Sequence, residues 1–148
     1  MAISYEKFEK YRVRRNLEHD ALYKYLIQDL NVFQNYPQLI NISSIIGYLN
    51  GPEYCIPFDK SAETVQLQFF SERSRDLIDF IAYAHKKEQA ILTSIDEEKF
   101  HIFEGYANGG FNILIQKLGI DVVDKTKNDR LEILRKYYIL LLMEDYKL

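Results

Sequence analysis

The chain has 148 residues, 47% of them hydrophobic and 28% charged, a balance that excludes long disordered or low-complexity stretches. The formal net charge of −3 excludes a uniformly basic nucleic-acid-binding domain, so that any nucleic-acid contact would be local. The single cysteine, Cys55, excludes an internal disulfide and no apolar run is long enough to span a bilayer, so we expect a cytoplasmic protein without a membrane anchor.

Helical spacing of apolar residues begins near the N-terminus, from about Ser4 to Leu30. The spacing slips before Leu17, which predicts a kinked first part that leads into a firmer helix from about Glu18. A second helix begins at Tyr36-Pro37, because proline is tolerated in a first turn, and it ends at Asn50-Gly51-Pro52, a strong stop signal.

The stretch from Glu53 to Phe70 is the least regular part of the chain. Pro57 and the alternation of Val65, Leu67 and Phe69 suit an extended segment, whereas Ser61 could equally cap a short helix. We predict a loop with one extended piece near residues 63–70.

Three further helices are predicted after this loop. A long one begins at about Ser71, and the next is capped by Ser94 or Asp96 and closed by Gly119. The last begins at about Asn128, and the residues expected to face inward are Leu131, Leu134, Tyr138, Leu141 and Leu142. The sequence therefore predicts a single-domain, all-α bundle of about five helices over residues 1–148.

Three of the six glycines lie in the run Glu104-Gly105-Tyr106-Ala107-Asn108-Gly109-Gly110-Phe111, although helical spacing continues through it. Because Gly105 and Gly109 are four residues apart, they would open a smooth groove on one side of a helix. A neighbouring helix of the same chain could fill this groove. Alternatively, the motif could bind a partner, through the candidate interaction residues Glu104, Tyr106, Asn108, Gly109 and Gly110.

The N-terminal segment, residues 1–35, is basic and interleaved with aromatic residues. Its cationic side chains are those of Lys7, Lys10, Arg12, Arg14 and Arg15. Such a mixture can grip phosphates and stack on bases, but Glu6 and Glu9 dilute the charge, and a solvated helix face explains it as well. Weak DNA contact through this segment is therefore an alternative function.

No residue pattern indicates catalysis, a metal site or a cofactor. The three histidines form no spaced ligand set, and the glycine run lacks the Walker pattern of a phosphate loop. His101 and Glu104 lie three residues apart and could pair on one helix face, but a solvated polar pair is the favoured interpretation. We expect a protein that is not an enzyme and that carries no cofactor.

Several motifs resemble the small accessory family associated with bacterial DNA phosphorothioation (Dnd) gene clusters. They are Ile45-Ile46-Gly47-Tyr48, Asn50-Gly51, Pro57-Phe58, Ile78-Phe80-Ile81-Ala82 and the glycine run itself. The resemblance covers about residues 39–118, within a core of residues 36–118, and does not extend to residues 1–35 or to the C-terminal helix in residues 119–148. It implies an accessory protein without assigned catalytic residues, encoded beside DNA-modification or phage-defence enzymes.

Together these observations favour a non-enzymatic adaptor that binds a larger protein subunit of a defence or DNA-modification complex. The 12 tyrosines suit a surface that is partly apolar and partly wet, and they make a homodimer compatible with the composition. The DNA-binding or regulatory module built on Lys7 to Arg15 remains the alternative.

Overall fold

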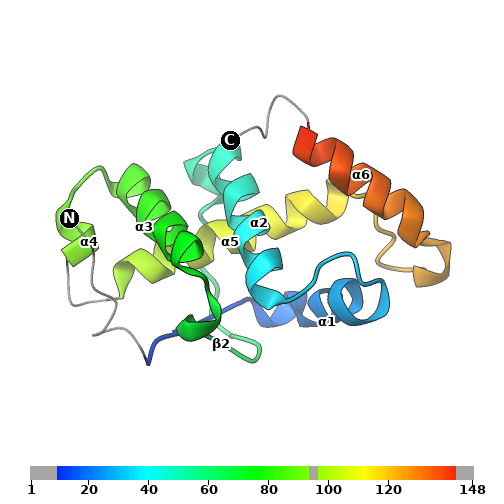
Figure 1. Cartoon of the computed structure of the whole chain (residues 1–148), viewed down its shortest axis with the longest axis horizontal. Coiled ribbons are helices and arrows are strands. Elements are labelled where there is room, and N and C mark those ends of the chain that lie inside the picture. The colour runs from blue at the N-terminus through cyan, green and yellow to red at the C-terminus, as the bar shows by residue number, and fades with distance from the viewer. Residues whose placement is uncertain (1–9, 94–96, 143–148) are drawn as a thin grey trace.

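The computed structural model describes residues 10–93 and 97–142, and this part of the chain is mostly helical (Figure 1). Its helices are α1 (Asp20–Lys24), α2 (Tyr36–Asn50), α3 (Glu72–Lys86), α4 (Ala90–Thr93), α5 (Glu98–Lys117) and α6 (Arg130–Leu142). Its strands are β1 (Arg12–Val13) and β2 (Val65–Gln66), which form one antiparallel pair. The predicted all-α class is confirmed. Over the described residues, none of the helices is long and apolar enough to cross a membrane.

Helix α5 is the central element of the fold. Helix α2 crosses it near its middle, α3 packs nearer its N-terminal end, and α6 lies towards its C-terminal end (Figure 1). From Lys99 to Phe111 almost every residue of α5 is buried, which is typical of a helix surrounded by other segments. The Lys99 ammonium lies 3.0 Å from the Asp79 carboxylate and so ties α5 to α3.

The ends of α2, α3 and α5 follow the signals in the sequence. The Asn35 side chain accepts a hydrogen bond from the Gln38 backbone N–H at the start of α2, and Ser71 caps α3 in the same way. Gly51 and Gly119 have positive φ angles of 120° and 65°, which suit residues that terminate helices. The predicted caps Ser94 and Asp96 lie outside the described residues.

The N-terminal segment differs from the predicted helix. Arg12 pairs with Gln66 and Val13 with Val65, so the described part of this segment starts as a strand, and helical turns begin only at Leu17. Tyr11 and Val13 are buried, and the Tyr11 ring stacks on Phe100 of α5 at 4.1 Å. Burial of alternate residues fits a strand, and this packing outweighs the irregular helical spacing. The extended piece predicted near residues 63–70 is confirmed as β2.

Helix α6 turns a different face inward from the one predicted. Ile133, Tyr137 and Leu140 are buried, and the Tyr137 ring packs edge-on against Phe33 at 4.9 Å. The residues expected inside are partly buried in one case, Leu134, and exposed in the others: Leu131, Tyr138, Leu141 and Leu142. Apolar residues occur all around this helix, so its spacing alone does not identify the buried side.

Candidate functional site

The glycines of the α5 motif are places where other backbone segments approach. A β-carbon at Gly110 would collide with the Ser43 carbonyl oxygen of α2 and would lie 2.5 Å from the Gly47 nitrogen. A β-carbon at Gly109 would lie 2.8 Å from the carbonyl carbon of Tyr54. The chain itself therefore fills the glycine-lined groove, with α2 and the segment that follows it.

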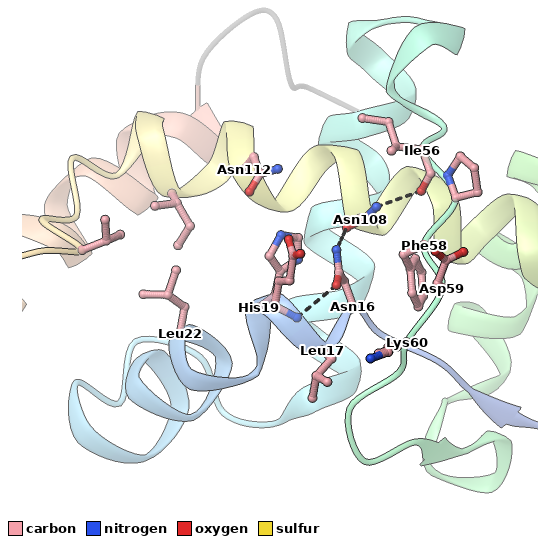
Figure 2. A pocket seen from close by; sticks show the side chains of 14 residues that line it. Asn16, Leu17, His19, Leu22, Ile56, Phe58, Asp59, Lys60, Asn108 and Asn112 are labelled. Carbon is pink, nitrogen blue, oxygen red and sulfur yellow. Dashed lines mark hydrogen bonds between the residues drawn. The ribbon is translucent and has the colours of Figure 1, made fainter.

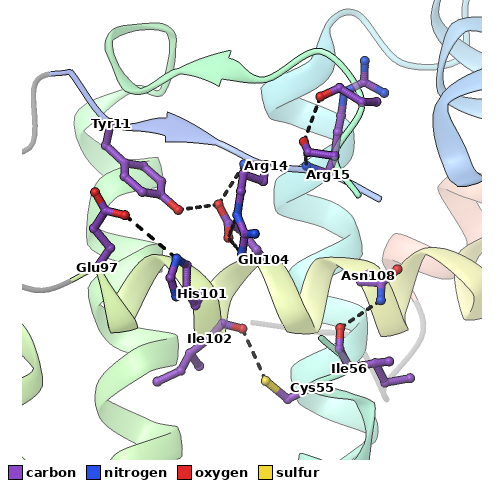
Figure 3. Close-up of polar contacts among 12 residues, drawn as sticks. Tyr11, Arg14, Arg15, Cys55, Ile56, Glu97, His101, Ile102, Glu104 and Asn108 are labelled. Carbon is purple, nitrogen blue, oxygen red and sulfur yellow. Dashed lines mark hydrogen bonds and ion pairs between the residues drawn. The ribbon is translucent and has the colours of Figure 1, made fainter. Parts of the chain in front are cut away.

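Glu104 anchors the N-terminal strand to α5 (Figure 3). Its carboxylate accepts hydrogen bonds from the Tyr11 hydroxyl at 2.6 Å and from the Arg14 backbone N–H at 2.7 Å, and the Arg14 guanidinium lies 3.0 Å away. Burial raises the pKa of the Glu104 carboxyl, while the hydrogen bonds from Arg14 and Tyr11 oppose this shift. The chemistry of this residue is thus directed at the chain's own N-terminal segment.

Tyr106 joins α5 to α3 and α2. Its hydroxyl lies 2.7 Å from His85 Nδ1, and its ring packs edge-on against the rings of His85 and Tyr48. Burial raises the pKa of the phenol to about 12. Tyr106 is therefore a neutral internal contact at physiological pH.

Asn108 forms part of the wall of a cleft of about 1050 Å³ (Figure 2). Its Nδ2 group donates to the Ile56 carbonyl at 2.8 Å, and its Oδ1 atom accepts from Asn16 at 2.9 Å. His19, also in the wall, packs against Phe111, and burial lowers the pKa of its ring. The amides of Asn16 and Asn108 are used to fasten two loops to α5.

The polar residues of the motif are therefore internal. Glu104 and Tyr106 are each 1% exposed and Asn108 is 7% exposed, while Gly109 and Gly110 are buried. Of the two interpretations of the motif, internal packing fits this burial, because the N-terminal strand, α2, α3 and the 54–56 loop pack against α5 here.

The basic N-terminal segment is divided between internal and external roles. Arg14 pairs with Glu104, and the 4%-exposed Arg15 pairs with Asp20 at 2.7 Å and lies over the Tyr36 ring. Lys10 and Arg12 are exposed, whereas Lys7 lies outside the described residues. Of the four described cations, Lys10 and Arg12 are exposed, Arg14 is partly exposed beside Glu104, and Arg15 is buried.

His101 and Glu104 do not form a joint site. The exposed His101 side chain lies 4.0 Å from Glu97, whereas the Glu104 carboxylate is buried against Arg14 (Figure 3). Cys55 is half-buried, with its Sγ atom 3.5 Å from the Ile102 carbonyl, and burial raises the pKa of its thiol. Within residues 10–93 and 97–142, no group of three or more His, Cys, Asp or Glu is arranged to hold a metal ion.

Two surface features were missed by sequence reasoning. One is a notch where Gln66, Gln68 and Arg75 join Lys10 and Arg12. The first two of these residues are separated from Lys10 and Arg12 by more than 50 positions, and the strand pairing brings the two groups together. The other is the outer face of α6, which carries Leu131, Tyr138 and Leu142. The sequence contained a signal for this face, because α6 has more apolar residues than one buried stripe requires.

The chain was compared with known protein families, curated proteins and solved structures. A family model described as DNA sulphur modification system-associated protein 4 matches residues 12–138. The match includes the N-terminal strand and most of α6, so the family extends beyond the stretch of residues 39–118 expected from the motifs. Neither the curated proteins nor the solved structures show a match. The chain belongs to the family of DNA sulphur modification system-associated protein 4.

Proposed function

We propose that this protein is a non-enzymatic, cytoplasmic accessory subunit that binds a larger protein of a bacterial DNA sulphur modification or phage-defence complex. Membership in a family associated with a DNA sulphur modification system supports the setting. One observation carries the adaptor role, namely the outward apolar face of α6.

Helix α6 is apolar on two opposite sides. Ile133, Tyr137 and Leu140 pack into the core, while the outer face, which we define as Leu131, Tyr138 and Leu142, is exposed by 71%, 57% and 75%. The spacing of seven and four residues places the three outer side chains in one stripe. Exposed stripes of this kind mark sites of protein interaction.

Exposed valines lie in the connection that leads to α6. Val123 is 92% exposed and Val122 is 50% exposed, between α5 and α6.

Burial of a large apolar side chain contributes about 1.5–3 kcal/mol. A partner that covers Leu131 and Tyr138 would therefore gain several kcal/mol from these two side chains, before the costs of association.

The test is a binding measurement between the purified protein and the other subunits of the DNA sulphur modification system from the same host. We expect at least one subunit to co-elute, and the double variant Leu131→Ser/Tyr138→Ser to weaken its binding at least about tenfold, which corresponds to 1.4 kcal/mol. Phe69→Ser is the matched control, because Phe69 is a 63%-exposed aromatic residue outside α6. Circular dichroism checks that all variants remain folded.

Two results would count against the proposal. Binding to none of the subunits at micromolar concentrations would remove the adaptor role. A dimer, measured by light scattering, that dissociates in the double variant would assign the outer face of α6 to a second copy of the chain.

A further inference from the structure

A notch of about 600 Å³ lies between the strand pair and α3, and three of the five described residues that line it are cationic. The described part of the lining consists of Lys10, Arg12, Gln66, Gln68 and Arg75, none of which is a carboxylate. In a chain with a net charge of −3, this is a local concentration of positive charge.

The strand register explains why these side chains converge. Arg12 lies directly opposite Gln66, and directly opposed residues project from the same face of a sheet. Lys10 precedes Arg12 by two residues and is exposed like it, whereas the intervening Tyr11 is buried. The Gln68 amide donates to Gln66 Oε1 at 2.7 Å, which orients the NH₂ group of Gln66 away from that bond.

Arg75 reaches the notch from α3 and is held in place. Its guanidinium donates to the Leu67 carbonyl at 3.3 Å, immediately after β2. This contact fixes the planar guanidinium group of Arg75 in the wall of the notch that it shares with Arg12. The cationic side of the notch is therefore built from two segments that are brought together by folding.

Arg14 and Arg15 have internal carboxylate partners, whereas Lys10 and Arg12 have none within residues 10–93 and 97–142. Arg14 pairs with Glu104 and Arg15 with Asp20. Among the described residues, no carboxylate forms an ion pair with Lys10 or Arg12. The charges of Lys10 and Arg12 repel each other, and an anion in the notch would relieve this repulsion.

We propose that the notch binds a backbone phosphate of a nucleic-acid strand. Arginine guanidinium groups match phosphate oxygens with paired N–H donors, and glutamine amides are common additional donors to phosphates. Lys10 and Arg12 also line a second hollow of about 440 Å³ together with Arg14 and His101. This arrangement suits an extended polyanion that passes from one hollow to the next better than a single small ion.

Two nearby carboxylates limit the extent of the positive potential around the notch. Glu97 lines the second hollow, and Glu63 lines a third one that also includes Arg12. These carboxylates lie beyond the notch, so the phosphate contacts are confined to a short segment of the strand. The inference is independent of the outer face of α6, since the two surfaces share no residue.

The experiment uses the full chain and a fluorescein-labelled 20-base-pair duplex, with fluorescence anisotropy measured at several NaCl concentrations from 50 mM upward. We expect binding at 50 mM that weakens with salt, and Arg12→Gln to weaken it about fivefold and to reduce the slope of log K against log[salt] by about 0.9. Arg75→Gln should act in the same direction. Arg73→Gln is the matched control, because Arg73 is exposed on the same helix and does not line the notch.

A second arm separates a polynucleotide from free phosphate. Inorganic phosphate is titrated into ¹⁵N-labelled protein, and the side-chain N–H signals of Arg12 and Gln66 are followed by NMR. Shifts with phosphate but no duplex binding would overturn the nucleic-acid strand as the ligand and leave a free phosphate. The absence of both effects, or equal losses in Arg12→Gln and Arg73→Gln, would overturn the site itself.

Discussion

The crossing of α2 and α5 can be tested with one methyl group. Gly110→Ala adds a β-carbon where the Ser43 carbonyl oxygen already lies and where the Gly47 nitrogen would be 2.5 Å away. Both obstacles are backbone atoms of a 15-residue helix, so no side chain can rotate to make room. Gly105→Ala is the matched control, since the nearest atom to its β-carbon would be the Cys55 Sγ, at 2.8 Å.

The expected magnitude combines two opposing effects. Carbon atoms pack best at about 3.5–4.0 Å from their neighbours, so α2 must shift by more than about 1 Å to accept the methyl group of the Gly110 variant. Overpacking of this kind costs about 1–3 kcal/mol or more, whereas alanine in place of glycine favours a helix by about 1 kcal/mol. We expect Gly110→Ala to lower the free energy of unfolding by about 2 kcal/mol and Gly105→Ala to change it by less than about 1 kcal/mol.

Urea denaturation followed by circular dichroism at 222 nm measures both variants. With an m-value of about 2 kcal/mol/M, the midpoint of Gly110→Ala should fall by about 1 M. If Gly110→Ala were as stable as the wild type, or more stable, the close backbone contact between α2 and α5 would be refuted.

Three further predictions concern buried polar groups. Glu104→Gln removes the charge that faces Arg14 and should lower the free energy of unfolding by about 1–3 kcal/mol in urea denaturation; an unchanged value would mean that the pair is not formed. Burial lowers the pKa of the His19 ring, because the folded protein disfavours the protonated imidazole. The contribution of the neutral ring to the free energy of unfolding is therefore fully present above the unfolded pKa of 6.5, and it is lost as the pH falls through the lower folded pKa. The melting temperature of the wild type should therefore fall more steeply between about pH 7 and pH 5 than that of His19→Gln. Parallel plots of melting temperature against pH would contradict this. Asp79→Asn takes away the carboxylate 3.0 Å from the buried Lys99 ammonium and should cost about 2–3 kcal/mol in urea, whereas a loss below about 0.5 kcal/mol would speak against the ion pair.

The sequence was informative where local signals and packing agree. Helix ends depend on backbone geometry and capping, which neighbouring residues determine. The ends signalled in this way are those at Tyr36-Pro37, Gly51, Ser71 and Gly119. The continuous helical spacing through the glycines likewise gave α5 correctly.

The N-terminal strand could not be predicted with the same rules. Its pairing with Val65 and Gln66 is a contact between distant residues, and the alternation of buried Tyr11 and Val13 with exposed Lys10 and Arg12 was a short signal beside a longer helical one.

The candidate site was predicted less well than the fold. The unusual composition of the glycine motif indicated that these residues make close contacts, and the structure shows such contacts. Composition does not tell whether the contacts are made inside the chain or with a partner at the surface. Arg12 and Arg75 line the same notch although they are distant in the sequence, and no spacing pattern in the sequence indicates that they lie together.

The backbone contact at Gly47 and Gly110 also has a mechanical consequence. This contact fixes the middle of α5 against α2. The 20 residues of α5 therefore form a rigid element about 30 Å long. The hollow that adjoins the notch includes His101 near one end of this element, and α6 lies towards the other end (Figure 1). A protein seated on the outer face of α6 therefore need not cover the notch, and the two surfaces could be occupied at the same time at a fixed separation.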